Sequence, residues 1–441
     1  MNQTANSGQP AKATASETGY PMRWAVYAFV LLFLLYLFDY LDRYVIVALY
    51  PFLKTDFGLT DAQCGLLMSG LVWTQVIVAL PVGLLLDRWS RKKSIGIMSI
   101  LWGIASLAGA VTTGFGQLLT TRCVVGVGEA GYGAGGTSIM SGIFKPNLRA
   151  RMLGFWQAAV PLGTALGVML GGLIATKYGW RSAIGIVAIP GILVAIMFFW
   201  VKDYKTVALT KSETKDDLPA AKKMSFADSI KELFRARSLI FVNIAFPLCM
   251  FGTSAVTTWL PSYFIRFGGM DVARASVTAS IVTMMAVVGT PLGGYLTDVW
   301  VRKQMRARML LPGVTTIATA ILAAVAFMTT GTVQFIILLI WGLLALMYLP
   351  GMMAVTQDVV HPGLRSMSRS VNVFIQGIIG ASLAPLVIGA ISDAYGLDKA
   401  MWVVAPVVLV GGILFLWGAF FYKKDLDQCE KCQLTFEGQG G

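Results

Sequence analysis

Apolar residues gather in about twelve runs, each long enough to cross a bilayer as a helix. A spanning helix needs about 20 predominantly apolar residues, and an unbroken run of 18 or more favours a membrane span over a buried soluble helix. The runs occupy residues 24–50, 63–86, 94–113, 117–143, 151–176, 182–201, 239–265, 275–297, 307–329, 332–356, 368–392 and 400–422. The pattern therefore predicts an all-α membrane protein with twelve transmembrane helices.

A long polar segment divides these runs into two sets of six. Residues 202–238 are polar and charged, and they separate a first set of spans at 24–201 from a second set at 239–422. The first 23 residues are polar and small and lack the apolar core of a signal peptide, so we expect an uncleaved, disordered cytoplasmic tail at 1–23. A second cytoplasmic tail is predicted at 423–441.

Short motifs repeat between the two sets in the same order. Gly83-x-x-x-Asp87 with a following Arg91 returns 211 residues later, and two further motifs return at offsets of 216 and 217 residues. The later copies are Gly294-x-x-x-Asp298 with Arg302, Pro362 for Pro146, and Tyr395-Gly396 for Tyr178-Gly179. Because matching loops lie on the same side of the membrane, the two halves are predicted to be pseudo-symmetric about an axis along the membrane normal.

Charged residues are few, and their distribution orients the chain. Only 13% of the residues are charged and 56% are hydrophobic, with a mean hydropathy of +0.71. Of 35 Lys and Arg residues, 27 fall in loops and tails on one side of the predicted membrane, 6 on the other side and 2 inside spans. Since loops rich in Lys and Arg stay in the cytoplasm, both termini are expected there, at a bacterial inner membrane. The same asymmetry explains the net charge of +13 without a nucleic-acid partner.

The chain offers little for catalysis or metal binding. The single histidine, His361, falls in a predicted cytoplasmic loop, which argues against a histidine-based triad and a multi-histidine metal site. Cys429 and Cys432 form the only Cys-x-x-Cys pair, and one such pair in a terminal tail is weak evidence for a metal or redox site. We therefore expect no enzyme activity, no metal and no cofactor.

Five charged residues lie inside the spans of the first half: Asp39, Asp42, Arg43, Arg122 and Glu129. Each costs about 2.5–3.5 kcal/mol at membrane depth on insertion scales, so such groups usually face a bundle interior or a watered cavity. Arg122 and Glu129 are two helical turns apart and share a face, and Asp39 can pair with Arg43 four residues later. Because the fourth span runs inward, Arg122 is expected near Asp42 and Arg43 in an outer, arginine-rich layer. Glu129 and Asp39 would form a deeper, acidic layer.

The balance of these charges predicts proton coupling. Three acids face two arginines, and in a low-dielectric cavity the carboxylate left over tends to hold a proton. Asp39, Asp42 and Glu129 are therefore the candidate proton carriers, while Arg43 and Arg122 are candidate contacts for an anionic substrate. The alternative is a self-neutralised Asp39–Arg43 pair with a purely structural role.

Further polar residues in or beside the spans are candidate substrate contacts. The second half holds no charge deep in its spans, so we expect it to supply shape and hydrogen bonds. The candidates in both halves are Tyr132, Gln157, Asn243, Trp259, Asn372 and Gln376. For each second-half residue, a hydrogen bond between helices is an equally good interpretation.

Two glycine-containing motifs have structural rather than chemical interpretations. Gly126-x-Gly128-x-x-Gly131 matches a dinucleotide-binding fingerprint, but it lies in a membrane span with no strand before it, so it predicts close helix packing. The repeated loop motif predicts a gate, because a carboxylate at a helix end can pair with a neighbouring cation and release it when the halves rock. Its gating residues are Asp87, Arg88, Arg91, Asp298 and Arg302. Plain anchoring by cytoplasmic positive charge is the alternative.

These motifs together resemble the major facilitator superfamily. The general marks are twelve spans in two halves, the Gly83 to Lys92 loop, and Arg122-x-x-x-Gly126-x-Gly128. Within it the chain resembles the Spinster-like branch over nearly its whole length. The residues that carry this resemblance are Tyr40-Leu-Asp-Arg43, Phe57 to Thr60, Gly126 to Tyr132, Arg149 to Met152, Gly179-Trp-Arg181, Arg365 to Asn372 and Pro385 to Asp393. Asp39 is a departure, since the family usually has asparagine there.

The resemblance implies a transport function. Eukaryotic Spinster-like members export sphingosine-1-phosphate or move lysophospholipids, and Asp42 and Glu129 match the acids thought to handle protons in this family. We therefore predict a proton-coupled secondary transporter that moves an amphipathic, anionic substrate such as a lysolipid by alternating access. A symporter of a small organic anion such as a sugar acid is the alternative, and a non-transporting receptor or scaffold is disfavoured by the deep charges. Its partners are expected to be the substrate, protons and membrane lipids, with the protein a monomer.

Overall fold

The computed structural model describes residues 22–88, 91–144, 146–201, 233–361 and 364–428. Over these ranges the chain is helical and contains no strand, and ten helices are long and apolar enough to cross a membrane. Most of the predicted tails, with Cys429 and Cys432, and most of the predicted linker lie outside the described residues. The last helix extends to Gln428, into the segment predicted as the C-terminal tail.

Every predicted span coincides with one helix or with consecutive helices. In the first half these are α1 (Met22–Phe57), α2 (Asp61–Arg88), α3 (Arg91–Gly109), α4 (Phe115–Glu129), α5 (Tyr132–Ile143), α6 (Pro146–Gln157), α7 (Ala159–Tyr178) and α8 (Trp180–Phe198). In the second half they are α10 (Arg237–Arg266), α11 (Val272–Val301), α12 (Ala307–Met328), α13 (Gly331–Leu344), α14 (Leu349–Asp358), α15 (Arg365–Ile375), the π-helix η2 (Gln376–Ala381), α16 (Leu383–Tyr395), α17 (Leu397–Trp402) and α18 (Val404–Gln428). The all-α expectation is therefore confirmed.

The span predicted as one helix at 117–143 is in fact broken. The N–H of Ala130 bonds to the carbonyl of Val127 at 3.3 Å, which is a tighter turn than an α-helix makes, and α5 begins two residues later. The corresponding span of the second half, 332–356, breaks in the same way between α13 and α14. Apolarity alone predicted the length of these spans, but it carries no signal for a local change of helix type.

The glycines of the dinucleotide-like motif allow close helix packing, as predicted. A Cβ on Gly126 would lie 2.3 Å from the carbonyl oxygen of Leu71 on α2, and one on Gly128 would lie 2.7 Å from Trp102 on α3. Real Cβ atoms essentially never approach other atoms that closely. The motif therefore lets α4 pack directly against two neighbouring helices.

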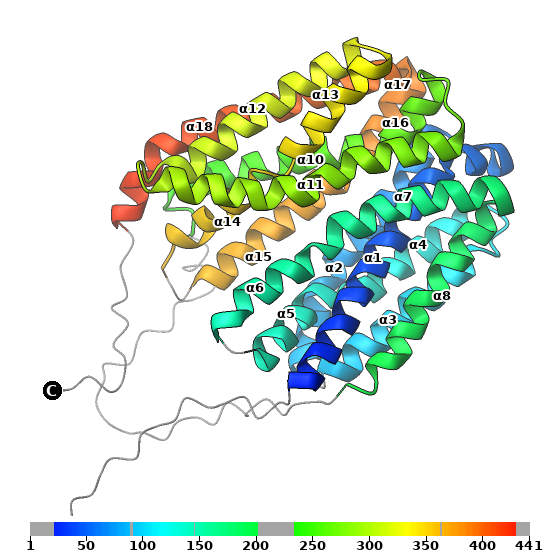
Figure 1. Ribbon diagram of the computed structural model, residues 1–441, viewed down its shortest axis with the longest axis horizontal. Helices are drawn as coiled ribbons and strands as arrows, with labels where there is room; N and C mark the ends of the chain where they lie inside the picture. The colour runs from blue at the N-terminus through cyan, green and yellow to red at the C-terminus, as the bar shows by residue number, and fades with distance from the viewer. Residues whose placement is uncertain (1–21, 89–90, 145, 202–232, 362–363, 429–441) are drawn as a thin grey trace, which may run out of the picture.

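The helices form two bundles that converge at one end of the molecule (Figure 1). Contacts between the bundles run mainly through α2 against α16 and α7 against α11. We call the end that contains α16 and α17 the joined end. The start of α1, in dark blue, and the end of α18, in red, lie at the other end (Figure 1).

The repeated Tyr-Gly motif has a backbone explanation at the joined end. Gly179 and Gly396 both adopt positive φ angles, 84° and 94°, a conformation that side chains with a Cβ rarely adopt. Each glycine ends one helix and immediately precedes the next, at Trp180 in the first half and Leu397 in the second. The same device turns the chain at equivalent points of the two halves.

The π-helix η2 lies where the second half contacts the first. A Cβ on Gly377 would lie 2.6 Å from the side chain of Val76 on α2. Beyond η2, Pro385 lacks the N–H that would bond to the carbonyl of Ala381, and the hydroxyl of Ser254 donates to that carbonyl at 2.7 Å instead. The next carbonyl, of Ser382, accepts from Ser69 on α2. Side chains from both halves thus satisfy the backbone of this distorted helix.

Replacing Gly65 on α2 with alanine tests the packing at the joined end. The new Cβ would lie 2.1 Å from the carbonyl oxygen of Pro385, and a backbone atom cannot rotate away. We expect Gly65→Ala to lower stability by about 1–3 kcal/mol, seen as a lower melting temperature of the purified protein. Gly185→Ala in α8 is the matched control, since its Cβ would meet nothing within 4 Å. Equal melting temperatures for the two variants would contradict the close packing.

Candidate functional site

The five charged residues predicted inside the first half are brought together in one buried cluster. Asp39, Asp42 and Arg43 project from α1, while Arg122 and Glu129 project from α4. All five are buried, with exposed fractions of 6% or less. We call this group the charge cluster.

Arg43 is shared between two acids of the charge cluster. Its Nη2 donates a hydrogen bond to Oε2 of Glu129 and lies 3.8 Å from Oδ2 of Asp39. The guanidinium also lies over the ring of Tyr40, with 4.6 Å between Cζ and the ring centroid. One cation therefore faces two carboxylates, and its stronger contact joins α1 to α4.

Arg122 serves the remaining acid. Its Nη1 lies 3.4 Å from Oδ2 of Asp42, and its Nη2 donates to the backbone carbonyl of Arg43 at 3.1 Å. The other oxygen of Asp42 accepts a hydrogen bond from the hydroxyl of Ser106 on α3. Asp42 thus has both a cation and a neutral donor, unlike Asp39.

The arrangement corrects one expectation and bears out another. Arg122 pairs with Asp42, while Glu129 lies with Asp39, as the helical spacing predicted. However, the side chain of Arg43 turns toward Glu129, so each level contains one arginine, and there is no arginine-rich layer above an acidic one. The self-neutralised Asp39–Arg43 pair is also not the main contact, because Glu129 is the closer partner.

Four buried polar atoms of the charge cluster lack a hydrogen-bond partner among the described residues. They are Oδ1 of Asp39, Oε1 of Glu129, Nε of Arg43 and Nε of Arg122. A buried polar atom without a partner costs about 1–3 kcal/mol, and more when the group is charged. Such unsatisfied atoms mark positions where a proton, water or an anionic ligand would gain a hydrogen bond.

Two other candidates of the first half have different surroundings. The hydroxyl of Tyr132 donates to the carbonyl of Leu32 at 2.6 Å, and its ring stacks on Tyr36. Its polar atom is therefore already used within the protein. Gln157 is exposed at the end of α6. A role for either residue in substrate binding stays a prediction.

Asn243 and Asn372 bond to each other in the second half. The amide of Asn372 donates to Oδ1 of Asn243 at 2.9 Å, and the guanidinium of Arg369 donates to Oδ1 of Asn372 at 3.0 Å. The tally of charges placed Arg369 in a loop, but α15 begins four residues earlier, at Arg365. A half-buried cation therefore lies near the start of this span.

Trp259 and Gln376 differ in whether their polar side-chain atoms have hydrogen-bond partners within the described part of the protein. The Trp259 side chain is fully buried, its Nε1 donates to the carbonyl of Pro385 at 3.1 Å, and its ring packs on Tyr50 of the first half. These contacts favour the structural interpretation over substrate contact for Trp259. Gln376, at the start of η2, has a buried Oε1 without a partner in the described part of the chain. Substrate contact by Gln376 stays a prediction.

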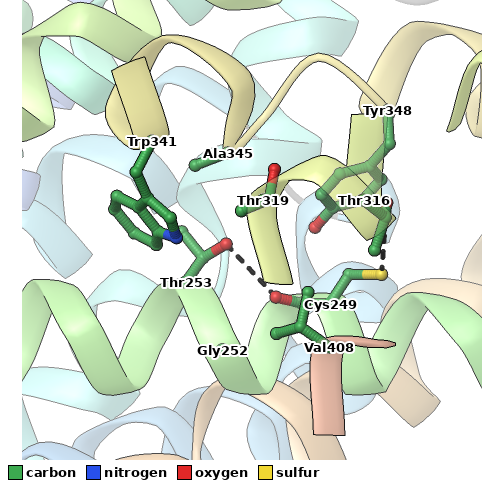
Figure 2. Close-up of a pocket in the computed structure, with 9 residues that line it drawn as sticks. All are labelled: Cys249, Gly252, Thr253, Thr316, Thr319, Trp341, Ala345, Tyr348 and Val408. Carbon is green, nitrogen blue, oxygen red and sulfur yellow. Dashed lines mark hydrogen bonds between the residues drawn. The ribbon is translucent and has the colours of Figure 1, made fainter. Parts of the chain in front are cut away.

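A small cavity in the second half lies at repeat positions equivalent to part of the charge cluster. It measures about 10 Å³, the order of a single water site. Figure 2 shows its lining, with Trp341, Ala345 and Tyr348 on one side and Thr253 on α10 opposite. Offsets of 211 and 216 residues relate Asp42 to Thr253, Glu129 to Ala345 and Tyr132 to Tyr348. Nε1 of Trp341 and the hydroxyl of Tyr348 are buried without partners in the described chain. The second half therefore has a neutral, hydroxyl-lined space at these positions.

The described residues give no ion pair that would support the predicted gate. The side chains of Asp87, Arg88 and Arg91 lie outside the described part of the structure. Asp298 and Arg302 are exposed, and no ion pair links either one to another described residue. Their gating role stays a prediction.

A different set of charges joins the two halves, at the joined end. Asp61 at the start of α2 accepts from Lys54 of α1 at 2.6 Å, from both terminal nitrogens of Arg266 of α10 at 2.6 Å, and from Ser392 of α16 at 2.5 Å. Asp393 accepts from the backbone N–H groups of Asp61 at 2.7 Å and Ala62 at 2.8 Å. We call these residues the Asp61 lock. Because α10 and α16 belong to the second half, the lock holds the two halves together.

Sequence reasoning missed this lock because its members are far apart in the chain. Lys54 and Arg266 were assigned to loops by the charge tally, and Arg266 is 205 residues from Asp61. The local signal was an acid directly before an apolar run, where it suits a helix N-terminus. Nothing in that signal identifies a partner in the other half.

Comparison with known proteins agrees with this fold. The family model described as Major Facilitator Superfamily matches residues 32–381. Protein spinster homolog 1 of Xenopus tropicalis is 27% identical over 457 residues, covering 94% of this chain and 84% of that protein. The hexuronate transporter of Bacillus subtilis (strain 168) is 27% identical over 401 residues, covering 86% of this chain and 92% of that protein. A bacterial homolog of the human lysosomal transporter Spinster, solved inward-facing and unoccupied, has a TM-score of 0.78 at 21% identity, covering 91% of this chain and 98% of that chain.

A double-mutant cycle on Asp42 and Arg122 tests whether the charge cluster stabilises the first half. Removing one partner of a buried ion pair costs about 3–5 kcal/mol, because the other charge is left uncompensated. We expect Arg122→Gln and Asp42→Asn each to lower the melting temperature of the purified protein markedly. The melting temperature of the double variant should fall by less than the sum of the two single decreases, because the double variant leaves neither charge of this pair without its partner. Strictly additive losses would mean that the two side chains are not coupled.

Proposed function

The chain belongs to the major facilitator superfamily as a Spinster-like transporter, and on this premise we propose that it is a proton-coupled secondary transporter working by alternating access. The observation that carries the proposal is the charge cluster, in which three buried acids face two arginines. A cluster with one carboxylate in excess can take up a proton without a new partner. Burial makes each change of charge there costly, so protonation can bias a conformational equilibrium.

Coupling would act through the guanidinium of Arg43. While Asp39 and Glu129 are both ionised, Arg43 is held between α1 and α4. Protonation of Glu129 would remove its attraction for Arg43 and free the cation to meet an anionic substrate. Release of the proton would draw Arg43 back to Glu129. The same side chain would thus respond to both the proton and the substrate, which is the requirement for coupled transport.

The sidedness of the charges suggests which conformation is present. If both termini are cytoplasmic, as the excess of Lys and Arg predicts, the joined end with the Asp61 lock faces outward. The protein would then be closed to the outside. Opening in that direction would require Asp61 to part from Arg266 and from Ser392. In this account the Asp61 lock is the outer gate, at a bacterial inner membrane.

An amphipathic anion such as a lysolipid is the proposed substrate. Arg122 and Arg43 offer a paired cationic contact for a phosphate or carboxylate head group, since guanidinium groups bind such anions with directed hydrogen bonds. The likeness to a sphingosine-1-phosphate transporter, 24% identical over 438 residues, supports a lipid-like cargo. The apolar helices around the charge cluster would accommodate the tail, and the protein would work as a monomer among membrane lipids.

A small organic anion such as a sugar acid is the second candidate. It is favoured by the likeness to a hexuronate transporter, which covers 86% of this chain. Both candidate substrates would bind Arg43 and Arg122 through an anionic group, and they differ in whether the rest of the molecule is apolar or polar.

The proton carriers can be tested with neutral isosteres. Glu129→Gln cannot take up a proton, so we expect it to lose pH-gradient-driven accumulation of a labelled lysophospholipid or hexuronate in proteoliposomes. Accumulation should fall to the level seen without a gradient. Counterflow exchange should persist, because it moves no net protons. Asp42→Asn is measured in the same way.

The control for this experiment is Asp427→Asn, which changes an exposed acid near the end of α18. It should accumulate substrate like the unmodified protein. If Glu129→Gln and Asp42→Asn both retain full gradient-driven accumulation, the coupling assignment is wrong.

The substrate class can be tested by stabilisation of the purified protein. A ligand that binds only the folded state raises the melting temperature, and the stabilisation grows with the logarithm of the ligand concentration above Kd. We expect lysophosphatidic acid to stabilise the protein more than glucuronate does, and Arg122→Ala to abolish the effect through loss of the head-group contact. Stabilisation by glucuronate alone would favour the second candidate. No response to either class would instead support a non-transporting role.

A further inference from the structure

A second cavity lies beside the Asp61 lock, between the two halves. It has a volume of about 160 Å³ and is lined by Pro51 and Lys54 of α1 and by Ser262, Ile265 and Arg266 of α10. This volume is about five times the share that one water occupies in the liquid, which is enough for a tetrahedral oxyanion. We call it the outer pocket, where "outer" rests on the proposed orientation.

The lining of the outer pocket has a positive charge and no acid. Lys54 and Arg266 both bind Asp61, but Asp61 itself is not among the residues that line the space. The Asp61 side chain is 4% exposed, whereas those of Lys54 and Arg266 are 34% and 31% exposed. The two cations are therefore held by one buried carboxylate on one side and present their other faces to the pocket.

The acids of the lock lie behind the two cations and not in the pocket. Asp61 bonds to Lys54 and Arg266, and Asp393 uses its two oxygens on backbone N–H groups of Asp61 and Ala62. Lys54 and Arg266 are therefore the charged groups that line the pocket. A guanidinium and an ammonium facing one space, with the hydroxyl of Ser262 beside them, provide the donors that phosphate and sulfate groups prefer.

We propose that the outer pocket binds an oxyanion of the phosphate or sulfate type, and that the bound anion holds the joined end closed. The pocket is formed by α1 of the first half and α10 of the second, so it exists as a site only while the halves are together at this end. A ligand that binds one conformation shifts the population toward it. The anion thereby acts as a brake on opening of the gate, separate from the substrate site at the charge cluster.

Free phosphate and the phosphate of a lipid head group share this chemistry, and they can be distinguished. The first measurement uses the purified full-length protein in detergent, with sodium phosphate compared against sodium chloride at equal ionic strength. We expect phosphate to raise the melting temperature by about 2–4 °C when its concentration is about tenfold above Kd. The second measurement repeats the chloride condition in nanodiscs of phosphatidylcholine with and without phosphatidylglycerol. Stabilisation only by the anionic lipid would identify the head group as the source.

Matched variants separate site binding from general screening. Lys54→Gln removes one cation of the pocket, while Arg266 retains its two hydrogen bonds to Asp61 and keeps the halves together. We expect this variant to lose the response to phosphate and to anionic lipid. Lys177→Gln removes an exposed cation at the end of α7, outside the pocket, and should respond like the unmodified protein. The proposal is overturned if neither anion stabilises the protein, or if Lys54→Gln responds unchanged.

A transport measurement then tests the brake. Phosphate added on the outer side of proteoliposomes should slow counterflow of the labelled lysophospholipid or hexuronate by the unmodified protein at least about twofold. Counterflow by Lys54→Gln should be unaffected by phosphate. Phosphate-specific stabilisation without slowing of counterflow would overturn the brake, while the binding site would stand. Because the stability measurements need no substrate and no pH gradient, they stay valid even if the proposed proton coupling fails.

Discussion

The contact between Arg43 and Glu129 is the interaction on which the first half depends. It joins α1 to α4 at a depth where neither charge could be left alone, and it draws Asp39 into the same group. Arg122 repeats the arrangement one level away with Asp42, and its second nitrogen bonds to the backbone of Arg43 itself. Four charges on two helices thus neutralise one another in interlocking pairs. Asp39 is left at 3.8 Å from a guanidinium that has a closer partner, and it is the least satisfied acid of the group.

The two halves share a backbone plan but divide the chemistry between them. Their fourth spans break at equivalent points, and Gly179 and Gly396 turn the chain with the same left-handed conformation. Glu129 nevertheless has Ala345 as its repeat counterpart, beside a cavity where Nε1 of Trp341 and the hydroxyl of Tyr348 find no hydrogen-bond partner among the described residues. A charged side chain inside a membrane is costly to bury and must be paired. One half of a repeated bundle can therefore keep its charged residues while the other half has neutral residues at the same positions, with the same helix packing. The asymmetry concentrates the deeply buried ion pairs of the described residues in the first half.

Local sequence patterns predicted the helices of this fold, but they did not predict most of the contacts between helices that are distant in the chain. The twelve spans follow from apolar runs, and the pairing of Glu129 with α1 follows from a spacing of seven residues after Arg122. The helix break at Ala130 and the π-helix at Gln376 could not be predicted, because both depend on packing against neighbouring helices. Arg369, at the start of an apolar run, was counted with the preceding loop, although α15 already begins at Arg365. The Asp61 lock was missed altogether, since Arg266 and Asp393 meet α2 only after the two halves have come together.

The two hydrogen bonds from Asp393 to the start of α2 have a consequence for how the halves can separate. A helix begins with N–H groups that have no partner within the helix, and a capping side chain normally comes from the residue just before it. Here Asp393 supplies acceptors for Asp61 and Ala62 from the opposite half. Thr60, just before α2, accepts from the N–H of Gln63 at 3.2 Å and does not serve the N–H groups of Asp61 and Ala62. Separation would leave those two N–H groups to water, at a cost of about 0.5–2 kcal/mol. Opening of the molecule and exposure of this helix end are therefore coupled. Salt would weaken the ion pairs of the Asp61 lock far more than it would weaken these bonds to the backbone.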